Sequence, residues 1–187
     1  TGRLMEAMVK WVQLSSLNVD DNPLQLELQP APLDLNYETL QPSTPSFQEV
    51  LPEMTALTEL NMRYMLHYAG VPSGLLAALP TQLEVLNMNE TISKIDSSFC
   101  EVLLQMTALR KLDLSGCNLF GRDVKLLTPA LANCHALTSL HMNGLRLTNT
   151  VEVSALVSGL TQLQLLHLEC CHHLKDRHMA KLVRSLY

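Results

Sequence analysis

Hydrophobic residues recur along the chain in the order Leu-x-x-Leu-x-(Leu or Met), with polar residues between them. The pattern begins at five leucines whose spacings are 26, 26, 28 and 26 residues: Leu57, Leu83, Leu109, Leu137 and Leu163. Self-similarity at a fixed period is typical of repeat architectures, in which each unit is one small structural module. The positions of each repeat are numbered below from its first leucine.

Each copy predicts a β-strand, because alternate side chains of a strand point to opposite faces. Positions 4 and 6 are apolar and are expected to point inward, while positions 3, 5 and 7 point outward. When such strands stack in parallel, their backbone N–H and C=O groups form hydrogen bonds with the neighbouring strands. Stacking also joins the small cores of the repeats into one column. Two irregular copies precede the regular ones: a degenerate strand at Leu14–Val19, and a second copy at Pro30–Leu35 in which proline replaces the first leucine.

Apolar residues at three- and four-residue spacing follow the strands and predict helices that each pack one stripe against the sheet. These sets are Leu75, Leu76 and Leu79; Phe99, Leu103 and Leu104; Val124, Leu127 and Leu131; Val153, Leu156, Val157 and Leu160; and Met179, Leu182, Val183 and Leu186. A further helix is expected over residues 4–13, and a short one after Ser46, which has capping-box spacing with Glu49.

The pattern therefore predicts an α/β fold: a right-handed solenoid with a parallel β-sheet on its concave face and helices on its convex face. Residues 55–187 are expected to form the repeats. Residues 1–54 are expected to form an irregular amino-terminal segment that combines a capping helix, a connection with five prolines and the degenerate copies.

The segment LDLSGCNLFGRDVKLLTPALANCHALTSL, residues 112–140, resembles the leucine-rich repeats of the ribonuclease-inhibitor-like group. Within that group it is similar to the cysteine-containing subtype known from ubiquitin-ligase substrate receptors. Position 9 is cysteine at Cys117 and Cys171 but Met65, Thr91 and Leu145 elsewhere, and no F-box-like helical segment precedes the repeats. The resemblance implies a leucine-rich-repeat solenoid and, as one function, substrate recognition for a ubiquitin ligase.

Composition narrows the classes of partner. Hydrophobic residues make up 47% of the chain and aromatic residues 4%, so leucine has to fill the core. The net charge is −5, with nine acids and two bases in residues 1–62 and nine acids and eleven bases in residues 63–187. The bases do not recur at one repeat position, which argues against a nucleic-acid surface. Residues 64–83 and 126–145 are uncharged over a membrane-span length, but each contains a turn and the start of a strand, so no span is expected.

Five cysteines are present, and those at position 9 are expected to be small buried side chains with reduced thiols. Reduced thiols indicate the cytoplasm, the nucleus or an organelle matrix. The chain begins at Thr1 rather than at a methionine, which leaves a removed targeting segment open.

The concave face is the expected binding surface of a solenoid. Its candidate protein-binding residues are the outward-pointing Asn61, Arg63, Asn87, Asn89, Lys111, Asp113, Ser115, Ser139, His141, Asn143, His167 and Glu169. These side chains are mostly short and polar and include no large aromatic anchor. Either an extended segment of a partner lies along this face, or the face is solvated and the functional contacts are elsewhere.

Two groups of residues have the side-chain types of a hydrolase site and of a zinc site. Asp113, His141 and Ser115 have the residue types of a hydrolase, but a flat parallel sheet offers no oxyanion donors and no enclosed pocket. Cys170, Cys171, His172, His173 and His178 include zinc-ligand types, but Cys171 is committed to the interior and adjacent side chains diverge. We therefore expect no metal, no cofactor and no phosphate-binding loop.

These observations favour a non-catalytic protein-interaction or scaffold module, as a structural subunit of a larger assembly. The alternative is the substrate-recognition subunit of a ubiquitin ligase, and a hydrolase is a distant third. Exposed ends of solenoids need a polar cover, so the carboxyl-terminal repeat is expected to be covered by a partner or by further chain.

Overall fold

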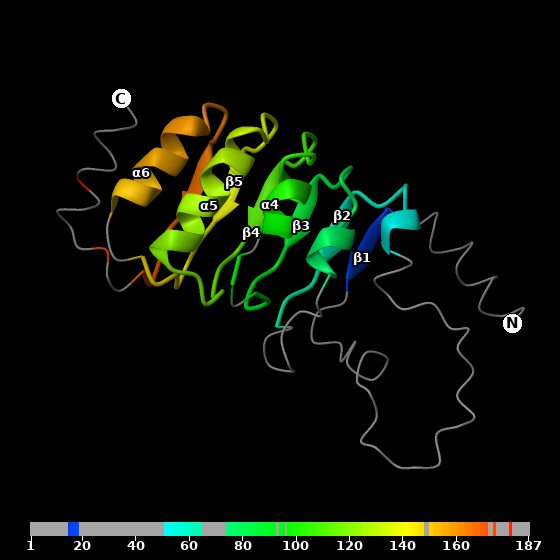
Figure 1. Cartoon of the computed structure of the whole chain (residues 1–187), viewed down its shortest axis with the longest axis horizontal. Helices are drawn as coiled ribbons and strands as arrows, with labels where there is room; N and C mark the ends of the chain where they lie inside the picture. The colour runs from blue at the N-terminus through cyan, green and yellow to red at the C-terminus, as the bar shows by residue number, and fades with distance from the viewer. Residues whose placement is uncertain are drawn as a thin grey trace, which may run out of the picture.

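Six short parallel strands form one sheet in the computed structural model, and their order in the sheet is their order in the sequence. The structure describes residues 15–18, 51–64, 74–92, 94–95, 97–147, 150–171, 174 and 180. The strands are β1 (Ser16–Asn18), β2 (Glu59–Asn61), β3 (Val85–Asn87), β4 (Lys111–Asp113), β5 (Ser139–His141) and β6 (Leu165–His167). This sequential parallel ladder, shown in Figure 1, is the α/β leucine-rich-repeat solenoid that the leucine spacing predicts.

The register aligns equivalent repeat positions side by side. Position 4 forms one row through Leu60, Leu86, Leu112, Leu140 and Leu166. Hydrogen bonds continue past the strands, because the amide at position 6 donates to the position 5 carbonyl of the next repeat, as from Met88 to Asp113 at 2.8 Å. The repeats are thus locked in phase by their backbone as well as by their leucines.

The first strand joins the ladder earlier than the sequence suggests. β1 contains Leu17 of the degenerate copy and pairs directly with β2, with Leu17 opposite Leu60. The ladder therefore passes directly from β1 to β2. The predicted copy at Pro30–Leu35 lies outside the described part of the chain.

Helices lie over one face of the sheet and cover its apolar side chains (Figure 1). Among the described residues they are α4 (Ser97–Leu103), α5 (Gly121–Ala132) and α6 (Thr150–Gly159). The described parts of the earlier repeats contain the 3-10 turns η1 (Leu51–Glu53) and η3 (Leu76–Ala78). Most of the predicted apolar stripe is buried, including Val124, Leu127 and Leu131 in α5. The prediction that Leu104 packs against the sheet is wrong, because this residue follows α4 and its side chain is 43% exposed.

Three other predicted helices fall partly or wholly outside the described residues. These are the helix over residues 4–13, the capped turn at Ser46 and Glu49, and the helix with Met179, Leu182, Val183 and Leu186. Within the described residues, no helix combines the length and the apolar character needed to cross a bilayer.

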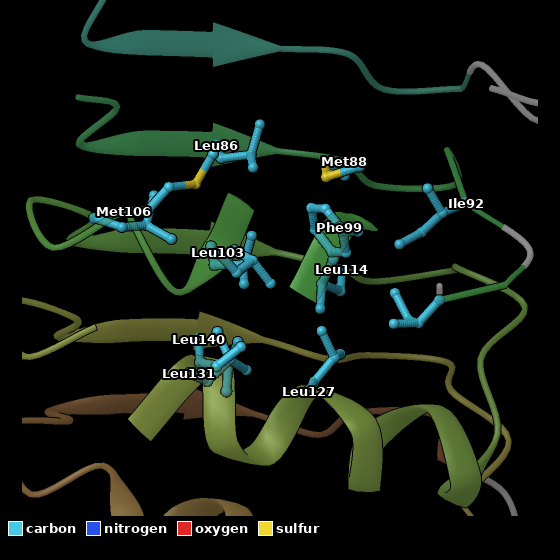
Figure 2. Close-up of a cluster of buried hydrophobic side chains, with 14 of the residues drawn as sticks. Leu86, Met88, Ile92, Phe99, Leu103, Met106, Leu114, Leu127, Leu131 and Leu140 are labelled. Atoms are coloured by element: carbon cyan, nitrogen blue, oxygen red, sulfur yellow. The ribbon is translucent and has the colours of Figure 1, made fainter. Parts of the chain in front are cut away.

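The core is one continuous column between the sheet and the helices. Figure 2 shows Phe99, Leu103 and Leu131 meeting side chains from the strands, among them Leu86 and Leu140. Each of these residues is fully buried, with exposures of 0%. The last repeat is less covered, since its inward leucines Leu163, Leu166 and Leu168 are only half-buried.

A left-handed turn follows each of the strands β2 to β6. Position 8 has positive φ in these five repeats: Tyr64 (63°), Glu90 (51°), Gly116 (66°), Gly144 (70°) and Cys170 (55°). Its amide donates to the position 7 carbonyl of the next repeat, as from Gly116 to Asn143 at 2.7 Å. The turn brings position 9 back into the core, where a hydroxyl or thiol donates to a carbonyl of the preceding repeat, as from Cys117 Sγ to Met88 O at 3.0 Å.

Candidate functional site: the open face of the sheet

The open face is the side of the sheet away from the helices, formed by positions 3, 5 and 7 of the repeats from β2 to β6. All twelve predicted binding residues occupy these positions, in the strands or immediately after them. The ladder thus brings them onto one surface, as their spacing predicts. Their hydrogen bonds divide the surface into two parts.

Along β2, β3 and β4 the polar side chains at position 5 cap the backbone of their own repeat. An Oδ1 atom accepts the amide two residues later: from Arg63 to Asn61 at 3.3 Å, from Asn89 to Asn87 at 3.0 Å, and from Ser115 to Asp113 at 2.9 Å. Asparagine and aspartate make this turn because their short side chains reach the amide two residues on. These three half-buried side chains therefore have a structural role in the turns that follow their strands.

The capping changes at β5 and β6, where position 5 is histidine. The amide of Asn143 donates to Ser115 Oγ at 3.1 Å, and the amide of Glu169 donates to Asn143 Oδ1 at 2.7 Å. Both acceptors belong to position 7 of the preceding repeat. Since the neighbouring repeat supplies the cap, the imidazoles of His141 and His167 are not required for it.

The two imidazoles form a pair on adjacent strands. Their ring centroids are 4.4 Å apart with an interplanar angle of 30°, and Ser139 Oγ lies 3.0 Å from His141 Nε2. Burial is the largest influence on the pKa of His141 and lowers it; Asp113 opposes this, while His167 and Lys111 lower the pKa further. His141 is therefore neutral at pH 7 and presents an uncharged ring.

An apolar side chain lies beside this pair. Leu165, at position 3 of β6, is 44% exposed and pairs in register with Ser139. Leu165 is not among the twelve predicted residues, because position 3 is mixed and in the other repeats holds Glu59, Val85, Lys111 and Ser139. Its exposure gives the face at β6 an apolar contact that the twelve polar residues lack.

The three hydrolase candidates, Asp113, His141 and Ser115, are not arranged as a catalytic triad. Ser115 is 5% exposed and its hydroxyl accepts the Asn143 amide, while Asp113 Oδ1 accepts the Ser115 amide. The hydroxyl that reaches His141 belongs to Ser139. Asp113, His141 and Ser115 are therefore close in register but are not linked as base, orienting group and nucleophile.

The candidate zinc ligands are divided by the turn after β6. Cys171 is buried, its Sγ donates to Met142 O at 3.3 Å, and burial raises its pKa, which disfavours the thiolate that zinc binds. Cys170 is exposed on the left-handed turn. His172, His173 and His178 lie outside the described residues, and within the described part no group of three or more histidine, cysteine, aspartate or glutamate side chains could hold a metal.

Similarity to known proteins is found among solved structures. No protein-family model matches the sequence, and no curated protein sequence matches it. Among solved structures, the chain is similar to an internalin from Listeria monocytogenes, with 19% identity, a TM-score of 0.45, and coverage of 63% of this chain and 30% of that one. It is also similar to the functional domain of InlJ from Listeria monocytogenes, described as including a cysteine ladder, with 19% identity, a TM-score of 0.37, and coverage of 67% and 33%. The chain thus spans about a third of the length of these structures.

Proposed function

We propose that this protein is a non-catalytic protein-binding module whose contact surface is the part of the open face over β4, β5 and β6. We define this binding patch as Lys111, Ser139, His141, Leu165 and His167. The observation that carries the proposal is the change of capping at β5, which leaves two histidine side chains out of the backbone turns that occupy Asn61, Asn87 and Asp113.

The chemistry of the patch suits a protein partner. Leu165 supplies exposed apolar area, and the paired imidazoles supply flat surfaces with donor and acceptor nitrogens. An apolar anchor surrounded by polar groups is the usual arrangement of the residues that dominate a protein interface. The patch is open and shallow, which suits a segment of another chain better than a small molecule.

Within this function, we assign the chain as a scaffold subunit of a larger multiprotein assembly in a reducing compartment. The half-buried leucines of the last repeat favour a subunit whose end is covered by a neighbour or by further chain. All five cysteines are free rather than joined in disulfides, which suits a compartment that keeps thiols reduced. Recognition of ubiquitin-ligase substrates is the second candidate, supported by the buried cysteines at position 9.

The test is copurification with matched variants. Tagged wild-type protein, Leu165→Glu and His167→Ala are expressed in cells of the native source, and bound proteins are quantified by mass spectrometry. Loss of a central interface residue typically costs about 2 kcal/mol, or roughly 30-fold in affinity. The patch variants are therefore expected to lose partners that the wild type retains.

Glu59→Ala is the control, because Glu59 is exposed at the same repeat position as Leu165 but lies on β2 at the other end of the open face. Each variant is first shown by circular dichroism to be folded. If Leu165→Glu and Glu59→Ala retain the same set of partners in the same amounts, the binding patch is wrongly assigned. Ligase core proteins among the partners lost would favour the second candidate over a structural assembly.

A further inference from the structure

A second polar cluster lies away from the open face, at the turns that lead from the strands toward the helices. Phe120 precedes α5, and a parallel backbone bridge pairs it with Arg146 in the turn after β5. The guanidinium carbons of Arg122 and Arg146 each lie 5.6 Å from the centroid of the Phe120 ring. Two cationic groups therefore share one aromatic ring, and we call these three residues the arginine–phenylalanine cluster.

The backbone fixes the cluster in place. The Arg146 amide donates to Leu119 O at 3.1 Å, which holds the two turns together. The Phe120 amide donates to Asp123 Oδ2 at 2.9 Å, and the Asp123 amide donates to Phe120 O at 2.9 Å, which holds the ring at the start of α5. The ring is thus a fixed platform for both side chains.

The charges of the two arginines are only weakly compensated. The Arg122 side chain is 77% exposed, and its ion pair with Asp123 joins Nε to Oδ2 at 3.9 Å, near the limit for such a pair. That same Oδ2 atom already accepts the Phe120 amide. Arg146 is exposed, and among the described residues no carboxylate forms an ion pair with it.

We propose that the arginine–phenylalanine cluster binds the carboxylates of an acidic segment of a partner protein. A guanidinium group matches a carboxylate through two parallel hydrogen bonds, and stacking on an aromatic ring limits the side-chain freedom lost on binding. Since both guanidinium carbons lie 5.6 Å from one centroid, they are at most about 11 Å apart, within the reach of two carboxylates on one short segment.

A nucleic acid fits the cluster less well. Nucleic-acid interfaces neutralise many phosphates at once, whereas this site offers two cations on one aromatic ring. Two local contacts suit a short acidic segment better than an extended polyanion.

The cluster is independent of the binding patch. It lies in the turns beyond positions 8 and 9 and at the start of α5, whereas the patch occupies positions 3 and 5 of the strands. A partner could therefore contact one surface without the other, and failure of one proposal leaves the other standing.

The test is direct binding of a defined peptide to the purified full chain. The probe is a fluorescein-labelled peptide of five glutamates, and a peptide of five glutamines is its uncharged counterpart; binding is measured by fluorescence polarisation in buffer with 50 mM and 300 mM salt. We expect the glutamate peptide to bind with an affinity that falls at the higher salt, and the glutamine peptide to bind at least tenfold more weakly. No binding of the glutamate peptide at 50 mM salt would overturn the proposal.

Three variants locate the site. Arg122→Gln and Arg146→Gln are each expected to weaken binding about tenfold, because each removes one charge-assisted contact. Arg110→Gln is the matched control: it removes the same charge from a side chain that is 69% exposed and pairs with Glu84 at 3.4 Å. Equal weakening by all three variants would reduce the effect to net charge and overturn the site. Displacement by inorganic phosphate at the carboxylate concentration of the peptide would also overturn it, in favour of a phosphate site.

Discussion

Two glycines at position 8 offer a matched test of the left-handed turn. Gly116 and Gly144 have nearly the same backbone, with φ of +66° and +70°, so an alanine side chain is strained at both. Their surroundings differ. A Cβ atom at Gly116 would lie 2.5 Å from Glu90 Cγ, whereas at Gly144 the nearest atom, Gly116 Cα, is 3.8 Å away.

The structure sets the size of each effect. Left-handed backbone costs an alanine about 1–2 kcal/mol, and the reduced freedom of the unfolded chain returns about 0.4–1 kcal/mol. Gly144→Ala is therefore expected to lower the free energy of unfolding by roughly 1 kcal/mol. Gly116→Ala carries the same cost and also forces Glu90 from its rotamer, which adds about 1 kcal/mol.

Urea denaturation followed by circular dichroism measures the difference. The set comprises wild type, Gly144→Ala, Gly116→Ala, Glu90→Ala and the double variant Glu90→Ala with Gly116→Ala. Removing the Glu90 side chain is expected to reduce the cost of Gly116→Ala to that of Gly144→Ala, and an unchanged slope with urea concentration validates the comparison. An equal cost with and without the Glu90 side chain would refute the reasoning.

Three further predictions concern stability. Leu112→Ala is expected to cost about 3 kcal/mol in urea denaturation and Leu166→Ala less than half as much, because Leu112 has strand neighbours on both sides and 0% exposure; equal losses would count against the stacked core. Cys117 and Cys134 have pKa raised from 9.0 to about 11, so the stability from their neutral thiols is complete below pH 9 and lost as the pH rises through 11. A melting temperature that stays constant from pH 9 to 11 would contradict this. Cys170→Gly relieves a positive φ of 55° and is expected to raise the free energy of unfolding by roughly 0.5 kcal/mol, whereas a loss would show that the turn is unstrained.

Leucine spacing was sufficient to predict the register of the ladder. Leu60, Leu86 and Leu112 align because position 4 is the inward position of every copy, and a one-residue slip would expose the whole apolar set. The helical spacing failed at Leu104, because α4 ends one residue earlier and leaves that side chain beyond the packed stripe.

The candidate site was predicted in location but not in bonding. Strand alternation correctly placed Asn87, Asp113 and His141 outward. It could not show which of these side chains accept a backbone amide, as Asn87 and Asp113 do, and which do not, as His141. The change from Asn or Asp to His at position 5 was the available signal, because imidazole does not replace the short side chain in the turn. The meeting of Phe120 with Arg146 was beyond prediction, since it depends on a bridge between turns of repeats whose spacings are 28 and 26 residues.

The change in capping along the sheet limits how such a chain can be rearranged. A unit with its own Asn or Asp at position 5 caps its own turn, so it needs no particular side chain at position 7 of the unit before it. The units of β5 and β6 instead use Ser115 and Asn143 of their predecessors. A unit that replaced β4 would therefore need a hydrogen-bond acceptor at position 7, whereas a unit that replaced β3 would not.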